Sequence, residues 1–318
     1  MKRLFVLLLF SSVHAFAQTD SLAPACTGSY FRFVTGTLAN DSMEGRLPGT
    51  AQEKKAAQFI AGEFTKAGCE AIGGKTFFPF EYIGPDSQTI IRSSGNVAAR
   101  MDTKSEYAIV VSAHYDHIGR GQYHSMAPFN HSIYNGADDN ASGVAMLLGL
   151  AAWCNAHKNE LSCDMIFVAF SGEEDGLYGS QEFLKNCPVD TAKILCCLNF
   201  DMIGRLDLLR PVLRIDAALD YFAWDSLLKT DSLERFTVSR KHNIIEEGAD
   251  HCSFINQHIP ALLFTTGLHE EYHTPDDDIR LINFSGMVLL ADYMQKLILQ
   301  MNRRKDLPDL FLRGNRTQ

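Results

Sequence analysis

Histidine and carboxylate side chains occur in five short segments of this 318-residue chain. Four of the segments end an apolar, strand-like run or follow one closely, and the fifth is a glycine-rich loop that opens a helix. They contain His114 in VVSAHYD, Asp139 in NGADDNASG, Glu173 and Glu174 in VAFSGEE, Asp201 in LNFDMIG, and His273 in EYHTPDD. Because ligands in open α/β sheets bind beyond the carboxyl ends of the strands, we expect the five segments to meet at one site. Imidazole and carboxylate together suit zinc, and the pattern indicates a zinc-dependent hydrolase.

Asp116 follows His114 by two residues, where a strand is expected to run into a loop. Two such residues can lie on one side of the chain, so Asp116 could accept a hydrogen bond from the ring nitrogen of His114 that faces away from a metal. That contact would fix the tautomer of the imidazole. The pair is equally compatible with two loop residues that make ordinary hydrogen bonds.

The segment NGADDNASG places two adjacent aspartates between Gly136 and Gly143, which permit a tight backbone. The helix that we expect to begin near Ala141 points its positive end toward these acids. An ordinary helix cap would explain only one polar side chain here and would leave the other acid without a role. Spacing alone does not decide between Asp138 and Asp139.

Glu173 and Glu174 are adjacent and come directly after an apolar run. Neighbouring carboxylates repel each other unless a cation compensates them. One of the two can bind a metal while the other stays free and takes a proton from water. A solvated acidic turn is the ordinary alternative, as a strand-end turn is for Asp201 and a surface position is for His273. We favour the functional interpretation because all five segments fall at the expected ends of the expected elements.

Apolar runs and turn residues predict the elements that hold these segments in place. Buried strands are expected over 107–114, 164–170, 194–201 and 260–266, after a strand pair over 76–83 and 88–101. Helices are expected over 28–40, 51–68, 141–154, 179–186 and, at the end of the chain, 283–302, while 211–250 reads as a strand near 212–216, a helix near 219–230 and a loop. The long loop over 117–137 is typical of a functional segment. Strands that alternate with helices predict an α/β fold, a three-layer α/β/α sandwich with a mixed, largely parallel central sheet.

The net charge of −9 and the pI near 5.6 argue against nucleic acid as a partner, since phosphate binding needs a basic surface. An acidic balance also suits a carboxylate-rich site that attracts cations. The eight cysteines permit disulfides but do not specify any. We expect Cys196 and Cys197 to be buried free thiols on opposite faces of one strand.

Residues 1–17 resemble a secretory signal peptide. Lys2 and Arg3 supply the charged start, an apolar core follows, and Ala15 to Ala17 form a small-x-small cleavage site. The apolar core is far shorter than the roughly 20 residues of a membrane-spanning helix. We therefore expect an exported protein, periplasmic or secreted, with no stable membrane insertion. No linker or repeat divides residues 18–318, so a single domain is expected there.

The order and content of these motifs resemble those of the co-catalytic zinc aminopeptidases, a family that includes bacterial leucyl aminopeptidases, aminopeptidase Y and, more distantly, glutaminyl cyclases. The resemblance runs from about Ser112 to Asp278 and implies a zinc-exopeptidase-like fold. A further block, GADHCSF over 248–254, is similar to the family's SDHxxF motif, with Ala249 in place of the serine.

The resemblance also implies the roles of individual residues. Two zinc ions would be bridged by Asp139, with His114 and Asp201 on one ion and Glu174 and His273 on the other. Glu173 corresponds to the general acid/base of the family. In the same comparison Asp116 corresponds to the partner that orients His114.

A mechanism for peptide hydrolysis follows from those roles. Two adjacent cations acidify water and polarise the scissile carbonyl. Glu173 would take the proton from the attacking water and pass it to the leaving amine, and Tyr272 is a candidate donor to the oxyanion. The resemblance favours removal of N-terminal residues over a carboxypeptidase activity on a related scaffold.

Two other functions remain as alternatives. Glutaminyl cyclases form pyroglutamate by acyl transfer and work with a single zinc, whereas this chain has the complete set of ligands for two ions, which favours hydrolysis. A non-catalytic binding domain that has kept the fold would be expected to have lost ligands, and here none is missing.

Overall fold

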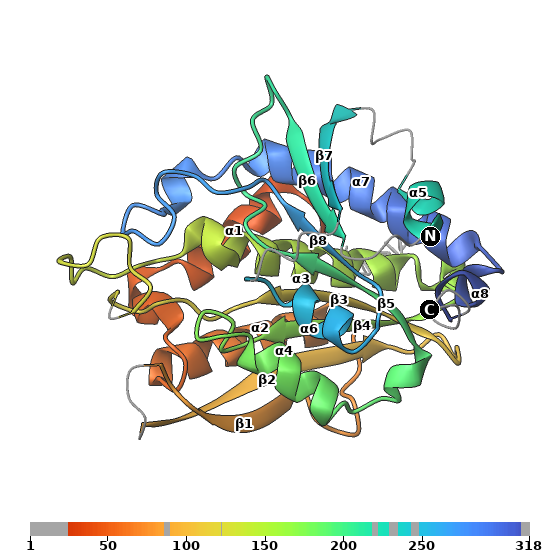
Figure 1. Cartoon of the computed structure of the whole chain (residues 1–318), viewed down its shortest axis with the longest axis horizontal. Helices are drawn as coiled ribbons and strands as arrows, with labels where there is room; N and C mark the ends of the chain where they lie inside the picture. The colour runs from red at the N-terminus through yellow and green to blue at the C-terminus, as the bar shows by residue number, and fades with distance from the viewer. Residues whose placement is uncertain are drawn as a thin grey trace, which may run out of the picture.

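The computed structural model describes residues 25–85, 90–121, 123–217, 222–228, 235–242 and 248–312. In this part of the chain, eight strands form one sheet that lies between two layers of helices (Figure 1). The strands are β1 Phe77–Ile83, β2 Ile91–Met101, β3 Ala108–His114, β4 Asp164–Phe170, β5 Ile194–Phe200, β6 Val212–Ala217, β7 Thr237–His242 and β8 Ala261–Thr265. The helices are α1 Gly28–Leu38, α2 Ala51–Lys66, α3 Gly143–Ala156, α4 Tyr178–Lys185, α5 Phe222–Leu227, α6 His251–Asn256, α7 Phe284–Arg303 and α8 Leu307–Leu312.

The strand order is β1-β2-β4-β3-β5-β8-β6-β7. The four central strands, β4, β3, β5 and β8, run parallel to one another. Strand β2 pairs antiparallel with both β1 and β4, and β6 pairs antiparallel with β8. Every residue of β3, β4 and β5 is buried, as expected for strands covered on both faces. The predicted fold, an α/β sandwich with a mixed and largely parallel sheet, is confirmed.

Side chains of the central strands alternate between two hydrophobic layers. Ile109 and Val111 of β3 pack in the layer that contains α1, α2, α3 and α7, whereas Val110 packs in the layer that contains α4 and α6. Cys196 and Cys197 divide between the same two layers, so the expectation of buried thiols on opposite faces of β5 is confirmed.

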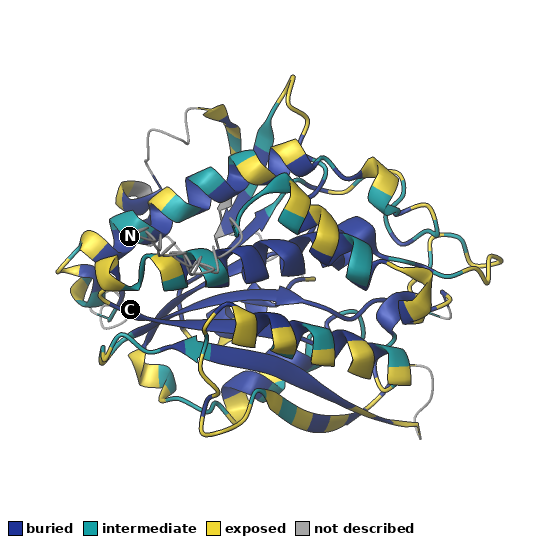
Figure 2. Cartoon of the chain, turned by 180° about the vertical axis from the view of Figure 1, so that it is seen from behind, coloured by how far each residue is buried: buried dark blue, intermediate teal, exposed yellow. Residues whose placement is uncertain are grey.

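Helix α3 is apolar on all sides because other elements cover it on all sides. It packs on the sheet through β3, β4 and β5, and α1, α2 and α7 contact it from the outside. In Figure 2 it is dark blue along most of its length, between helices that expose one face. The cap of this helix therefore lies deep in the molecule, and the polar groups around it have to be satisfied by protein.

Three elements were not predicted: β7, α6 and α8. Strand β7 carries the largely polar run TVSRKH at the edge of the sheet, and α6 is only six residues long, so neither has a clear apolar period. The helix predicted over 283–302 is confirmed as α7, although the short helix α8 follows it. The candidate signal segment, 1–17, lies outside the described residues. Among the described residues no helix is long and apolar enough to span a bilayer.

Candidate metal centre

The parallel strands bring the predicted segments to one edge of the sheet. His114 is the last residue of β3, Asp201 directly follows β5, and Glu173 and Glu174 lie just beyond β4. His273 reaches the same place from the loop after β8. The apolar runs that form the core thus also set the positions of these side chains.

Asp139 lies between the two histidines that sequence reasoning selected. Its Oδ1 is 3.2 Å from Nε2 of His114, and its Oδ2 is 3.1 Å from Nε2 of His273. The backbone of Asp139 is not helical, and the peptide bond between Asp139 and Asn140 is cis. A carboxylate that presents one oxygen to each histidine has the arrangement of a ligand shared by two metal ions.

The first group of candidate ligands surrounds His114. Its Nε2 lies 3.5 Å from Oδ1 of Asp201 and 3.8 Å from Oε2 of Glu173, and the three side chains could hold one ion. Glu173 is the most distant of the carboxylates around this nitrogen. It also borders an open cavity of about 320 Å³, so its carboxylate is accessible to a substrate.

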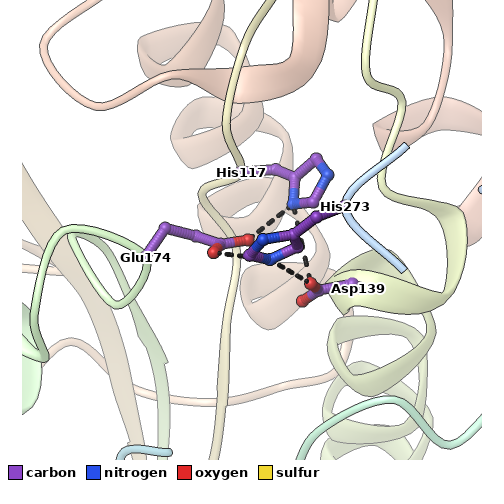
Figure 3. A group of neighbouring side chains, drawn as sticks. All are labelled: His117, Asp139, Glu174 and His273. Carbon is purple, nitrogen blue, oxygen red and sulfur yellow. Dashed lines mark hydrogen bonds and ion pairs between the residues drawn. The ribbon is translucent and has the colours of Figure 1, made fainter. Parts of the chain in front are cut away.

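The second group contains a residue that the sequence prediction missed, His117 (Figure 3). His273 Nε2 lies 2.9 Å from Oε2 of Glu174, and His117 Nδ1 lies 2.6 Å from Oε1 of the same carboxylate. His117 Nδ1 is 3.9 Å from Oδ2 of Asp139. Glu174 is therefore in contact with two imidazoles from opposite ends of its carboxylate.

His273 and His117 differ in what the second nitrogen of the imidazole contacts. Nδ1 of His273 donates to the carbonyl of His124 at 2.7 Å, which orients the ring so that Nε2 can act as a ligand. Nε2 of His117 is buried, and the structure shows no hydrogen-bond partner for it among the described residues. As a ligand through Nδ1, His117 would bury an N–H group with no acceptor, and Nδ1 of His114 likewise has no hydrogen-bond partner among the described residues, so this cost does not separate the two rings. Nδ1 of His117 lies at hydrogen-bond distance from Oε1 of Glu174, which fits a donor that orients this carboxylate.

The loop that carries Asp139 is held by polar contacts from other ligand-bearing segments. The backbone N–H groups of Asp138 and Asp139 each donate to Asp277 at 3.0 Å. The carboxylate of Asp138 accepts from the N–H of Gly204 at 2.6 Å, and Asn140 caps α3 by accepting from the N–H of Gly143 at 3.0 Å. The two adjacent aspartates are thus distinguished: Asp139 faces the histidines and Asp138 braces the loop.

Asp116 contacts the glutamates more closely than it contacts His114. Its Oδ1 is 3.6 Å from Nδ1 of His114, longer than a hydrogen bond, whereas its carboxylate accepts from the backbone N–H groups of Glu173 and Glu174 at 3.3 and 3.4 Å. Asp116 is completely buried. It therefore fixes the turn that carries both glutamates, and its predicted role as the partner of His114 stays a prediction.

Arg46, which comes from a turn between α1 and α2, is completely buried behind the site. Its guanidinium donates to four backbone carbonyls, those of Leu38, Tyr115, Asn135 and Gly136. Burial lowers the pKa of Arg46 to about 10, opposed by the charges of nearby carboxylates, so the side chain stays charged at neutral pH. It places one fixed positive charge beside the acids and ties together the loops that follow His114 and precede Asp139.

The two adjacent glutamates have opposite electrostatic surroundings. Burial raises the pKa of Glu173 well above its usual value, and the charges of Asp201, Glu174 and Asp250 add to that effect against the opposing influence of His114. Burial and Asp139 would also raise the pKa of Glu174, but His273 and His117 outweigh them and lower it to about 2. One glutamate is thus suited to hold a proton, and its neighbour is suited to stay ionised.

His273 shows how strongly the site attracts positive charge. Burial would lower its pKa, but the carboxylates of Glu174 and Asp139 outweigh burial and raise that pKa to about 11. Protons on the imidazoles here compensate buried carboxylates. A divalent cation does the same and releases those protons, so the donor set fits metal ions.

His117, Arg46 and Asp277 were the functional residues that sequence reasoning did not single out. His117 follows His114 by three residues, and this H-x-x-H spacing beyond a buried strand could have drawn attention to it. Asp277 lies in the same HTPDDD segment as His273, where three consecutive acids have the same local pattern. Arg46 has no sequence signal, because its partners are backbone carbonyls.

The cavity above the centre is lined by Glu173, by the predicted ligands other than His273, and by residues of β6, β8 and the following loops. Tyr272, the candidate oxyanion donor, lines it and stacks on His273 with ring centroids 3.8 Å apart. Ala249, which replaces the serine of the related motif, also lines the cavity.

Comparisons with known proteins agree with this arrangement. The sequence pattern of Peptidase family M28 matches residues 96–298, which include every predicted site residue. A probable leucine aminopeptidase of Arthroderma benhamiae is 33% identical over 113 residues, which are 34% of this chain and 30% of that protein. The chain thus spans about a third of the length of this relative.

Solved structures share the fold. A Zn-dependent exopeptidase from Parabacteroides distasonis superimposes with a TM-score of 0.70 at 18% identity, covering 88% of this chain and 99% of that one. A glutaminyl cyclase from Porphyromonas gingivalis gives a TM-score of 0.69 at 18% identity, covering 86% and 98%. At this level of identity the two structures agree in fold alone, and they represent both of the reactions considered from the sequence.

Proposed function

The chain belongs to peptidase family M28, and on this premise we propose that it is a zinc-dependent aminopeptidase with two metal ions per chain. The observation that carries the proposal is the position of Asp139, which presents one carboxylate oxygen to His114 and the other to His273. Asp201 would complete the ligands of the first ion and Glu174 those of the second. Imidazole and carboxylate ligands at this spacing suit zinc.

When bound, the two ions would acidify the attacking water and polarise the scissile carbonyl. The side chains of the protein have separate tasks. Asp116 and Arg46 hold the loops that carry the ligands, and His117 donates to Glu174 so that one oxygen of this carboxylate stays directed at the ion. Tyr272 is placed in the cavity wall, where its hydroxyl can donate to the developing oxyanion.

Glu173 is the proposed general base and acid. It borders the cavity, lies at the edge of the ligand group, and has a raised pKa beside an ionised neighbour. A pair of carboxylates whose pKa values are driven apart divides into one proton carrier and one ligand. Glu173 would take the proton of the attacking water and deliver it to the amine of the leaving peptide.

Glutaminyl cyclase is the competing function, since solved members of that group share the fold. It would use one zinc and act on peptides that begin with glutamine. The presence of two candidate ligand groups, one of which contains Asp139, supports two ions and hydrolysis.

Metal analysis of the purified protein, joined to a panel of aminoacyl chromogenic substrates and one glutamine-starting peptide, tests the proposal. We expect two zinc ions per chain and release of N-terminal residues that a chelator abolishes and zinc restores. One ion per chain together with pyroglutamate formation would establish the cyclase instead. Activity that the chelator leaves unchanged would contradict both functions.

We also propose that residues 18–318 act as one domain and that the protein is exported after removal of residues 1–17. The charged start, the short apolar core and the Ala15 to Ala17 site support this. N-terminal sequencing of the protein recovered from its native host would show a chain that begins at Gln18. A chain that still begins with Met1 would contradict processing at this site.

A further inference from the structure

We infer that Arg214, in the wall of the cavity, binds a carboxylate group of the substrate. The inference rests on the proposed function in one respect, because it takes the cavity above the metal centre to be the place where a peptide binds. It adds a substrate class: short peptides that carry a carboxylate close to the scissile bond, on the N-terminal side chain or at a nearby free C-terminus.

The position of Arg214 is set by strand pairing. Strand β6 runs antiparallel to β8, and Arg214 lies opposite Thr265. Both residues line the same cavity as Glu173 and Asp139. Because a regular strand pair fixes the backbone of Arg214, the side chain extends from a defined point in the wall.

Gly267 lets the guanidinium of Arg214 lie against the backbone of the loop after β8. A Cβ atom at this glycine, whose φ is +93°, would lie 2.6 Å from Cζ and 2.9 Å from Nη1 of Arg214. Any other residue at position 267 would therefore displace the guanidinium. The close approach holds the planar group at the cavity wall, so less freedom is lost when it binds a ligand.

Arg214 differs from the other arginines near the centre in having no partner among the described residues. Arg46 donates to four carbonyls, Arg92 pairs with Asp175 at 2.8 Å, and Arg205 pairs with Asp277 at 3.4 Å. No hydrogen bond or ion pair joins Arg214 to a residue of the described segments. Its five N–H donors are thus available to a ligand that enters the cavity.

Among the described residues that line the cavity, Arg214 is also the single lysine or arginine. Four of the lining carboxylates belong to the metal centre, and a fifth, Asp216, lies two residues along β6 and is buried. The lining is therefore rich in carboxylates that attract the substrate's ammonium group. The guanidinium of Arg214 complements a carboxylate of the substrate, which it can bind through two parallel hydrogen bonds.

Binding to the zinc-loaded Glu173→Gln protein tests the inference without turnover. Two matched pairs of probes separate the sources of the carboxylate: a dipeptide amide that begins with aspartate against its asparagine counterpart, and dialanine with a free carboxyl terminus against dialanine amide. We expect the carboxylate probe of at least one pair to bind about 10–100-fold more tightly than its neutral partner, as is typical of hydrogen bonds between charged groups. The probe pair that shows this difference in affinity identifies which carboxylate of the substrate Arg214 binds.

Variants of Arg214 in the same Glu173→Gln background decide whether this residue is the cause. Arg214→Gln should reduce the ratio to about one, and Arg214→Lys, which keeps the charge but not the planar fork, should leave an intermediate ratio. Leu268→Ala, which changes an uncharged residue of the same wall, should preserve the ratio. Thermal unfolding of each variant shows that the fold is kept.

The inference would be overturned by affinity ratios near one for both probe pairs in the Glu173→Gln protein that keeps Arg214. An unchanged affinity ratio in Arg214→Gln would also overturn it. Turnover by the unmodified enzyme is measured separately. If it hydrolyses peptides while both probe pairs bind with ratios near one, the proposed function stands and the role of Arg214 fails. If it hydrolyses no peptide while the Arg214-dependent ratio persists, the carboxylate site stands and the proposed function fails.

Discussion

The metal centre and the cavity wall lie next to each other but are built in different ways. In the metal centre, defined here as His114, Asp139, Glu173, Glu174, Asp201 and His273, the side chains are largely buried. Arg46, Asp116 and Asp277 hold the loops that carry several of them. The cavity wall, defined as Arg214, Thr265, Gly267 and Leu268, depends on strands near one edge of the sheet, and Leu268 is 70% exposed. A rigid centre and a less enclosed wall divide the work, so the reaction and the choice of substrate can change independently.

The largest effect that tests this division is expected at Glu173. Glu173→Gln should lower kcat by about 10²–10⁴-fold and leave the zinc content unchanged, because the residue moves a proton and lies at the edge of the ligand group. Glu174→Gln is the matched control and should lose zinc as well as activity. Zinc analysis and steady-state kinetics measure both. Normal turnover in Glu173→Gln would remove this residue from the mechanism.

Arg46 tests whether the rigidity of the centre comes from the network behind it. Arg46→Met leaves four buried carbonyls without their donor and removes a charge beside several acids, which should cost about 3–5 kcal/mol in the free energy of unfolding. Arg46→Lys should cost less, since it keeps the charge and part of the hydrogen bonding. Urea unfolding gives both values. A change in Arg46→Met below about 0.5 kcal/mol, the range of surface substitutions, would show that the loops hold themselves in place.

His117 separates an outer hydrogen-bond donor from a ligand. His117→Phe should weaken binding of the second zinc ion by about 10–100-fold, whereas His117→Asn, which places an amide N–H near the position of Nδ1, should recover most of the affinity. X-ray absorption of the zinc-loaded protein should count two imidazoles for two ions. A count of three, with no rescue by asparagine, would make His117 a ligand.

The smallest effect is expected in the wall. Leu268→Ala should raise KM for leucyl substrates by no more than about fivefold and leave kcat unchanged, since a largely exposed leucine recovers only part of the roughly 1.5–3 kcal/mol of full burial. Steady-state kinetics on leucyl and alanyl substrates measure the change. A large drop in kcat would mean that the wall also positions the reacting atoms, and the contrast with the metal centre would disappear.

The sequence predicted the elements that depend on apolar pattern and the meeting of the candidate ligands that terminate them. The four central strands are continuous apolar runs, and a parallel sheet must bring their carboxyl ends together, so His114, Glu174 and Asp201 could be placed before any coordinates were known. The choice of Asp139 over Asp138 depends on side-chain direction around a non-helical turn, and spacing does not encode that direction.

The residues that sequence reasoning missed act through long-range contacts. Arg46 donates hydrogen bonds to backbone carbonyls as far as 90 residues away in the sequence. Every residue of a chain has a backbone carbonyl, so the sequence does not indicate which ones Arg46 contacts. The long loop over 117–137 was recognised as functional in character, but which of its side chains turns inward depends on the contact between His117 and Glu174, 57 residues apart. Strand β7 lies at the sheet edge and carries the largely polar run TVSRKH, so it lacks the continuous apolar run that marks an inner strand.

The uniformly apolar α3 has a consequence for how the chain acquires its structure. Two of the helices that shield it, α1 and α7, lie on either side of it in the chain, and α7 is made more than 120 residues after α3. During synthesis the apolar surface of α3 therefore stays partly exposed until α7 has been made. Until then the nascent polypeptide is prone to aggregation, and it depends on rapid completion of synthesis or on a chaperone.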